Sequence, residues 1–247
     1  RDVWAGVTTY VSKDPFGQPG NGTSGSQSLS ADGTYVVFSS SSSNLVPNDT
    51  NGRADVFLVE WQADPPLIER ISVSSEGEQA DGGSGNPSIT ADGRYVMFAS
   101  DATNLVPEGR PGIRVYVRDR LEGTTRMVSK TVIGEWGNGS AIKPHLSCDG
   151  THVVFLSSAS NLVPGDANGR DDVYLRALDV PLLTSGDGDC DGDIDFADFA
   201  LVQRCFTGDA LNAPLIGPEC YALDFNFDGH VDHFDFAEYL AARSGPR

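Results

Sequence analysis

A stretch of seventeen residues occurs three times in this chain, and the repeat constrains the possible fold more than any other feature. The copies read ADGTYVVFSSSSSNLVP from Ala31, ADGRYVMFASDATNLVP from Ala91 and CDGTHVVFLSSASNLVP from Cys148. They start 60 and then 57 residues apart. A nearly constant period of this length indicates a fold that stacks one supersecondary unit repeatedly.

Each repeat carries signals for several short β-strands. An apolar run follows an Asp-Gly turn, and further β-rich runs follow the Asn-Leu-Val-Pro corner and precede the next Asp-Gly pair. The expected strands cover residues 35–40, 55–60, 68–74, 87–90, 94–100, 114–119, 124–130, 152–157 and 172–175. Four short strands per repeat are typical of β-propeller blades, and 28 Gly with 14 Pro also favour a turn-rich, mainly β protein.

The nine residues SADGTYVVF, from Ser30 to Phe38, resemble the S-x-D-G-x-x-x-x-F core of TolB-like propeller repeats. This resemblance covers residues 1 to about 180 and implies a propeller built of such blades. Propellers of this kind serve as scaffolds, sugar-binding proteins, peptidase gates and lyases. The resemblance therefore implies a fold and leaves the activity open.

The number of blades is small for a closed ring. Residues 1–4 align with 53–57 and residues 8–12 with 71–74, so the chain opens on the last two strands of a blade. The third repeat shows no clear final strand before Pro181. Because rings usually hold four to eight blades, we expect either a truncated piece of a longer protein or an open arc with exposed edge strands.

Aromatic residues recur in the first predicted strand of each repeat. They are Tyr35, Phe38, Tyr95, Phe98 and Phe155, and His152 occupies the position of Tyr35 and Tyr95. Recurrence at strand centres predicts that this column, His152 included, forms the blade cores. A platform on which sugar rings stack is the alternative.

An acidic segment inside the repeats allows two interpretations. Residues 49–55 (DTNGRAD) recur as residues 166–172 (DANGRDD), whereas the middle copy has EGRP at residues 108–111. The carboxylates could hold a cation between blades. Alternatively, the Asn-Gly pairs simply make turns.

Two acidic segments of twelve residues lie near the carboxyl end, DGDCDGDIDFAD at residues 187–198 and DFNFDGHVDHFD at residues 224–235. Both place oxygen-bearing side chains at positions 1, 3, 5, 9 and 12, a carbonyl at 7, Gly at 6 and an aliphatic residue at 8. Clustered oxygen ligands favour calcium over zinc, copper or magnesium, so we expect two bound Ca²⁺ ions. The predicted ligands are Asp187, Asp189, Asp191, Asp193, Asp195 and Asp198, and then Asp224, Asn226, Asp228, His230, Asp232 and Asp235, with Asp193 and His230 acting through their carbonyls. An acidic disordered tail is the alternative.

Helix-breaking residues precede both loops, so only exiting helices are expected, over residues 199–206 and 236–243. This loop-then-helix duplication resembles a type I dockerin, over roughly residues 186 to 243. The resemblance implies a small α-helical calcium-binding module that plugs secreted bacterial enzymes and surface proteins into cohesin partners.

Loop positions 10 and 11 hold Phe196, Ala197, His233 and Phe234, where dockerins of known partnership usually carry small hydroxyl residues. Three roles for these apolar residues remain open. They could contact a cohesin-like or other protein partner, dock the module on the propeller of the same chain, or join the module's own core.

The cysteines and the charge indicate the compartment and the kind of partner. A bridge between Cys205 and Cys220 would close a loop of about fifteen residues and contribute about 3 kcal/mol, which suits an oxidising compartment. Cys148 and Cys190 are interpreted as free small residues, or as a second bridge. A formal net charge of −18 argues against nucleic acid and anionic membranes as partners, and no run of about eighteen apolar residues predicts a membrane span.

The sequence thus predicts an open or partial propeller over residues 1–180, a linker over 181–186 and a dockerin-like domain over 187–243. The preferred function is a non-catalytic, calcium-binding interaction protein, secreted or at the cell surface, whose propeller binds protein or polysaccharide. The alternative is an extracellular polysaccharide-degrading enzyme, a glycoside hydrolase or lyase, with the propeller as its catalytic domain. No residue set in the repeats has the spacing of a G-x-S-x-G elbow, and the separation of paired carboxylates cannot be read from the sequence.

Overall fold

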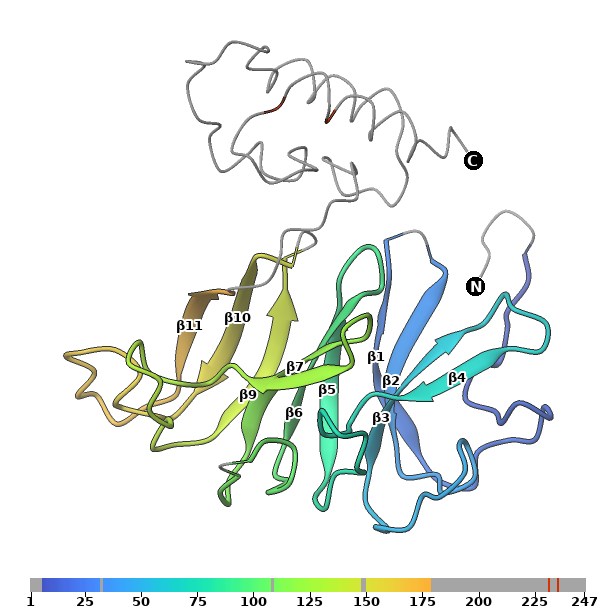
Figure 1. The fold of residues 1–247 in the computed structure, drawn as a ribbon, viewed down its shortest axis with the longest axis horizontal. Helices are drawn as coiled ribbons and strands as arrows, with labels where there is room; N and C mark the ends of the chain where they lie inside the picture. Colours follow the sequence, from blue (N-terminus) through green and yellow to red (C-terminus); the bar gives the residue numbers. More distant parts are fainter. Residues whose placement is uncertain are drawn as a thin grey trace.

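The computed structural model describes residues 6–31, 33–107, 109–147, 150–178, 231 and 235 (Figure 1). These residues form three antiparallel sheets, which we call blades 1, 2 and 3. Blade 1 contains β1 (Ser24–Leu29), β2 (Tyr35–Ser40), β3 (Asp55–Glu60) and β4 (Leu67–Arg70). Blade 2 contains β5 (Ser84–Ile89), β6 (Tyr95–Ser100), β7 (Arg114–Asp119) and β8 (Thr124–Met127). Blade 3 contains β9 (Ala141–Leu146), β10 (His152–Ser157) and β11 (Asp172–Ala177).

In each blade, strands that are consecutive in the chain are neighbours in the sheet. The first strands β1, β5 and β9 also contact one another from blade to blade, and the three sheets stand side by side in Figure 1. Consecutive meanders joined along their first strands are the arrangement of propeller blades. The prediction of a mainly β protein with propeller blades is confirmed for the described residues.

Two apolar cores lie between the blades. Val56 and Leu58 of blade 1 pack with Phe98, Tyr116 and other buried residues of blade 2. On the other side of blade 2, Val115 and Val117 pack in the same way with side chains of blade 3. Because blade 2 has a neighbour on each face, every residue of β6 and β7 is buried.

The aromatic column belongs to these cores, as predicted. Phe38, Tyr95, Phe98 and Phe155 are at most 3% exposed, so their faces cannot serve as a sugar platform, and Tyr35 is half-buried. The prediction for His152 is wrong, because this side chain is exposed. This position is buried by the following blade, because Tyr35 and Tyr95 each pack on the Asp-Gly turn of the next blade. His152 lies in blade 3, and no blade that follows blade 3 is described.

Gly93 shows how closely the blades approach. It has φ +74°, and a Cβ placed on it would lie 2.3 Å from Cδ2 of Tyr35 in blade 1. Gly33, the equivalent residue of blade 1, has φ +72° and open space around it. We expect Gly93→Ala to destabilise the protein by about 1 kcal/mol more than Gly33→Ala, because both variants share the backbone strain and only the first displaces a ring. Urea unfolding of the two variants measures this difference, and equal losses would contradict the close packing.

The ends of the blades differ from the prediction. The outer strands β4 and β8 stop at Arg70 and Met127, short of the predicted residues 74 and 130. The chain there turns into a hairpin with an isolated bridge, Val73 to Gln79 or Lys130 to Trp136. A third bridge of this kind joins Lys13 to Pro19, and within the described part of the chain residues 8–12 belong to no strand.

The first strand of every blade contains a β-bulge. Ser26, Asn86 and Lys143 occupy equivalent positions and have φ values of 49°, 51° and 51°. The pairing register with the next strand shifts at the same places. All three side chains are exposed, so the bulge presents a polar residue at the inner edge of each blade.

Among the described residues, no helix is long and apolar enough to cross a membrane.

Candidate functional site

The predicted calcium ligands lie outside the described residues, with one exception. The undescribed ligands are Asp187, Asp189, Asp191, Asp193, Asp195, Asp198, Asp224, Asn226, Asp228, His230 and Asp232. Asp235, at loop position 12, has helical backbone and is 1% exposed, and Val231, at position 8, is fully buried. All four cysteines, including the predicted pair Cys205 and Cys220, also lie outside the described residues. The dockerin-like interpretation therefore stays a prediction.

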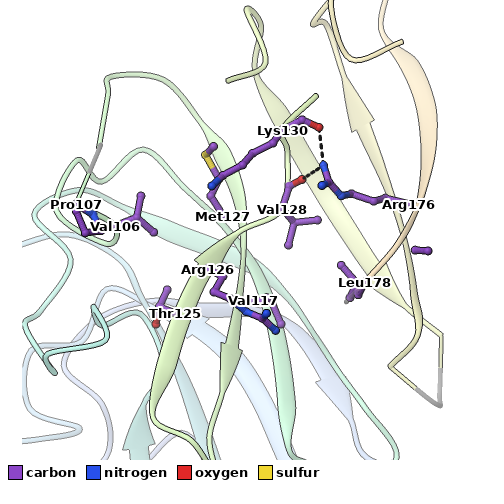
Figure 2. A pocket seen from close by; sticks show the side chains of 11 residues that line it. Val106, Pro107, Val117, Thr125, Arg126, Met127, Val128, Lys130, Arg176 and Leu178 are labelled. Atoms are coloured by element: carbon purple, nitrogen blue, oxygen red, sulfur yellow. Dashed lines mark hydrogen bonds between the residues drawn. The ribbon is translucent and has the colours of Figure 1, made fainter. Parts of the chain in front are cut away.

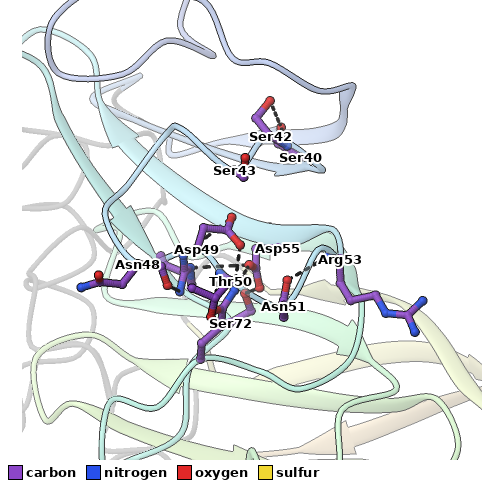
Figure 3. A network of polar contacts seen from close by, with 12 residues as sticks. Ser40, Ser42, Ser43, Asn48, Asp49, Thr50, Asn51, Arg53, Asp55 and Ser72 are labelled. Atoms are coloured by element: carbon purple, nitrogen blue, oxygen red, sulfur yellow. Dashed lines mark hydrogen bonds and ion pairs between the residues drawn. The ribbon is translucent and has the colours of Figure 1, made fainter.

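The acidic segment of blade 1 forms a buried polar network (Figure 3). The side chains of Asp49 and Asp55 are 3% and 0% exposed. Gln79 Nε2 donates to both carboxylates, at 2.9 Å and 3.0 Å, and Ser72 Oγ donates to Asp55 at 2.6 Å. The Arg70 guanidinium lies 3.6 Å from Asp49 and 3.5 Å from Asp55.

Arg70 occupies the position that a cation between these carboxylates would take. Burial raises the pKa of Asp55, and the hydrogen bonds from Ser72 and Gln79 and the charge of Arg70 offset this rise only in part. Asn51 makes the expected turn, with its Oδ1 accepting from Arg53 N–H at 2.7 Å. The sequence allows residues 49–55 to be either a cation site or a turn, and the structure favours the turn. The described residues contain no group of three or more His, Cys, Asp or Glu side chains that could hold a metal ion.

The equivalent segment of blade 3, residues 166–172, has fewer hydrogen-bond partners for its buried carboxylate. Asp166 accepts a 2.6 Å hydrogen bond from the hydroxyl of Tyr174, which raises the pKa of Tyr174 to about 12. The other oxygen of Asp166, Oδ1, is buried and has no hydrogen-bond partner. In blade 1 the partners of the equivalent Asp49 come from Arg70 and Gln79, on the outer strand and its hairpin. Blade 3 has no described outer strand.

Two arginines join neighbouring blades, and the sequence patterns did not reveal this role. Arg118 of β7 is 8% exposed and donates to Ser74 O of blade 1 at 3.0 Å. Arg176 of β11 donates to Val128 O and Lys130 O of blade 2, at 2.9 Å and 2.5 Å. The sequence could have indicated this role, because each arginine interrupts an otherwise apolar strand. The two strands read VYVRD at residues 115–119 and VYLRA at residues 173–177. A buried charge there needs acceptors, and backbone carbonyls of the preceding blade supply them.

A groove of about 350 Å³ lies between β8 and β11 (Figure 2). Three cationic side chains line it, Arg126, Lys130 and Arg176, beside apolar side chains that include Met127 and Val106. We call it the basic groove. Among the described residues that line it there is no carboxylate, imidazole or thiol, and their one hydroxyl, on Thr125, donates to Val73 O at 2.6 Å. The basic groove is therefore suited to bind an anionic group.

The two described histidines also fail to suggest a catalytic centre. His145 and His152 are exposed on neighbouring strands of blade 3. The ring nitrogen Nδ1 of His152 lies 2.8 Å from the hydroxyl of Thr151, and no ion pair within the described part of the chain includes either histidine. Neither imidazole is therefore oriented by a carboxylate, as a general base in a catalytic triad would be.

Comparisons with known proteins add similarity in fold alone. No protein-family model and no curated protein matches the chain. Among solved structures, TolB from Acinetobacter baumannii is 15% identical with a TM-score of 0.41, and the match covers 64% of this chain and 30% of that one. The tricorn protease is 14% identical with a TM-score of 0.37, covering 56% of this chain and 11% of that one. A prolyl endopeptidase is 18% identical with a TM-score of 0.39, covering 69% and 23%.

The match thus spans about a third of the TolB structure and smaller shares of the other two. All three TM-scores are below 0.5, so they support no statement about activity, substrate or partner. The propeller architecture of this chain rests on the order and packing of its own sheets.

Proposed function

We propose that this protein is a secreted, calcium-binding, non-catalytic interaction protein. A dockerin-like module in residues 187–243 takes up two Ca²⁺ ions and attaches the protein to a partner, while the propeller blades bind protein or polysaccharide. The spacing of the two twelve-residue loops is the observation that carries this proposal. Without cations, the carboxylates of one loop would repel each other at short range, so metal binding and folding of the module are coupled.

The two described residues of the second loop support the proposal. Val231 occupies position 8, where a calcium loop directs an aliphatic side chain into the module, and it is 0% exposed. Asp235 occupies position 12, where the last ligand lies at the start of the exiting helix, and it is helical and 1% exposed. A solvated acidic tail would leave both side chains exposed, since an unpaired carboxylate gains from contact with water.

The basic groove supports a binding role for the blades. In a chain of net charge −18, three cations around one apolar-walled groove favour an anionic ligand, such as a uronate-bearing or sulfated sugar. A screen of the intact protein against neutral, uronate-bearing and sulfated polysaccharides tests this role. Binding without turnover is expected, and turnover of any of them would establish the enzymatic alternative instead.

Calcium titration by calorimetry tests the metal sites. We expect a stoichiometry near two for the full chain, and loss of binding in Asp187→Ala combined with Asp224→Ala, because each change removes the first ligand of one loop. The matched control is Glu76→Gln combined with Glu78→Gln, which removes the same charge from two exposed positions of blade 1 and should leave binding unchanged. No heat of binding to the full chain, or equal binding by both double variants, would exclude the proposed sites.

A further inference from the structure

Blades 1 and 2 each place an arginine beside the start of the third strand, but on different strands. In blade 1 the Arg70 guanidinium, on the outer strand β4, lies 3.6 Å from Asp49 and 3.5 Å from Asp55, and both carboxylates are buried. In blade 2, Arg114 of β7 occupies the position of Asp55, and Met127 of β8 occupies that of Arg70. A carboxylate on the third strand is thus accompanied by a cation on the outer strand.

Blade 3 has the carboxylates of blade 1 without their cation. Asp166 and Asp172 occupy the positions of Asp49 and Asp55. One oxygen of Asp166, Oδ2, accepts from the Tyr174 hydroxyl at 2.6 Å, whereas the other, Oδ1, is buried and has no hydrogen-bond partner. No ion pair within the described residues includes either aspartate. A cation that reaches Asp166 is therefore favoured, because an unpaired buried carboxylate is costly.

The chain that directly follows β11 cannot supply this cation. In blades 1 and 2 the connections from the third strand to the outer strand are short and span residues 61–66 and 120–123. Residues 179–203 contain no lysine and no arginine. An outer strand formed by the residues that follow β11 would therefore carry no cation at the position of Arg70.

The open edge of β11 offers the backbone groups that an outer strand needs. In blade 1, Val56 N–H donates to Ser72 Oγ at 3.1 Å, and Val56 O accepts from Ile71 N–H at 2.8 Å. Blade 2 repeats both bonds at the same distances, between β7 and the residues that follow β8. Val173 is the equivalent of Val56, and no described strand other than β10 pairs with β11. An extended segment can therefore add to this edge.

A groove of about 350 Å³, which we call the edge groove, lies beside this edge. Tyr174, the equivalent of the residue that faces Arg70 across the sheet of blade 1, lines it together with Phe155, Leu162, Val163, Lys130 and Arg176. The apolar part of this lining suits the apolar stem of an arginine. Lys130 is compatible with an arginine in the outer strand, because blade 1 has Lys13 at the equivalent position of its preceding hairpin.

We propose that the edge of blade 3 binds an extended segment of a partner protein, and that an arginine of this segment pairs with Asp166 and Asp172. The arginine is followed by an apolar residue and a serine, as in residues 70–72 of blade 1. The N–H of the apolar residue donates to Val173 O. The serine hydroxyl accepts from Val173 N–H and donates to Asp172. This inference rests on the binding role proposed for the blades and specifies the partner as a protein segment.

The outer strand of blade 1 provides a probe for this edge. A fluorescently labelled peptide of residues 66–74 (PLIERISVS) is titrated with the full chain in calcium buffer, and its anisotropy is measured. We expect a dissociation constant on the order of 10 μM. The peptide with Arg70→Met should bind at least tenfold more weakly, because it has no charge for the carboxylates. The peptide with Ser72→Ala should bind about fivefold more weakly. Neither peptide variant can affect the folding of the protein.

A change in the protein identifies the carboxylate. Asp166→Asn keeps an acceptor for the Tyr174 hydroxyl and removes the charge. It should weaken binding of the unchanged peptide at least tenfold, and should alter binding of the Arg70→Met peptide less than twofold, because the charge pair is already absent there. Asp171→Asn is the matched control, since it removes the same charge from an exposed neighbour, and it should alter binding of both peptides less than twofold.

A chain that does not bind the unchanged peptide at millimolar concentration would overturn the proposal. Binding that Asp166→Asn leaves unchanged would also overturn it, because the peptide would then lie elsewhere. Equal losses in Asp166→Asn and Asp171→Asn would do the same, since they would show attraction to net charge alone. The calcium titration and the polysaccharide screen measure other sites, so failure of this proposal is distinguishable from failure of the proposed function.

Discussion

Phe98→Ala is expected to lower the free energy of unfolding of the blades by about 4 kcal/mol. Phe98 is 0% exposed and belongs to the core between blades 1 and 2. It also stacks on Tyr116 of its own sheet, with 5.8 Å between ring centroids. The substitution therefore leaves a cavity that both the sheet and the interface between blades border, and the surrounding strands cannot collapse into it without breaking their register.

Urea unfolding followed by tryptophan fluorescence measures this loss, because Trp61 and Trp136 pack against two of the apolar clusters of the blades. Phe16→Ala is the matched control. Phe16 is 89% exposed, so the same change in side chain should alter the unfolding free energy by less than about 0.5 kcal/mol. Equal losses in the two variants would show that Phe98 does not lie in a packed core.

Arg70→Met is expected to cost about 3 kcal/mol at pH 7, because it leaves two buried carboxylates without their cation. The side chains of Asp49 and Asp55 are 3% and 0% exposed, and Arg70 is the cationic side chain that contacts both. Methionine retains most of the apolar stem of arginine, so the loss reports the missing charge rather than missing volume.

The loss in Arg70→Met should depend on pH. The pKa of Asp55 in the folded protein is already raised by burial, and removal of Arg70 raises it further. A carboxyl with a raised folded pKa stabilises the folded state at low pH, and this contribution disappears as the pH rises through the folded pKa. The difference from wild type should therefore be largest at neutral pH and shrink as the pH falls toward the unfolded value near 4.

Unfolding in urea at pH 7 and near pH 4 measures this dependence. Arg53→Met is the matched control, because Arg53 belongs to the same loop and its side chain is exposed. It should change stability little at either pH. A loss in Arg70→Met that does not vary with pH would mean that the network is held by packing and not by charge.

Local sequence signals predict the strands well where each strand carries its own signal. The predicted strands 35–40, 55–60, 114–119 and 152–157 agree with β2, β3, β7 and β10 at both ends. Each lies in an apolar run that follows a turn signal, which is an Asp-Gly pair, an Asx-rich loop or, before 114–119, a Gly- and Pro-containing loop. Neighbouring residues alone therefore decide its limits. The first strand of blade 2 is longer than predicted. The sequence pattern predicts a strand over residues 87–90, whereas β5 covers Ser84–Ile89. The bulge at Asn86 interrupts the alternation that marks a strand.

Contacts between blades cannot be predicted in this way. Arg118 and Arg176 are long cationic side chains, which usually lie in solvent. Carbonyl acceptors from the preceding blade help to hold both of them, and Gly123 O of its own blade also accepts from Arg118. The sequence places His152 in the core because its column is aromatic elsewhere, yet it is exposed, since burial of this column depends on the next blade. The predicted calcium ligands rest on spacing, and Asp235 is the one whose burial the structure describes.

The full burial of β6 and β7 in blade 2 has a consequence for amide hydrogen exchange. Each blade contacts only its neighbours, so resistance to opening should vary along the chain instead of having a single value. Amides of β6, which is enclosed on both faces, should exchange only through global unfolding. Amides of β1 and β11 belong to the first and the last of the three blades, so they should exchange through local opening of their own blade. A ligand or partner that covers either end would be detected as a local slowing of exchange there, which locates its binding surface even when the ligand itself is unidentified.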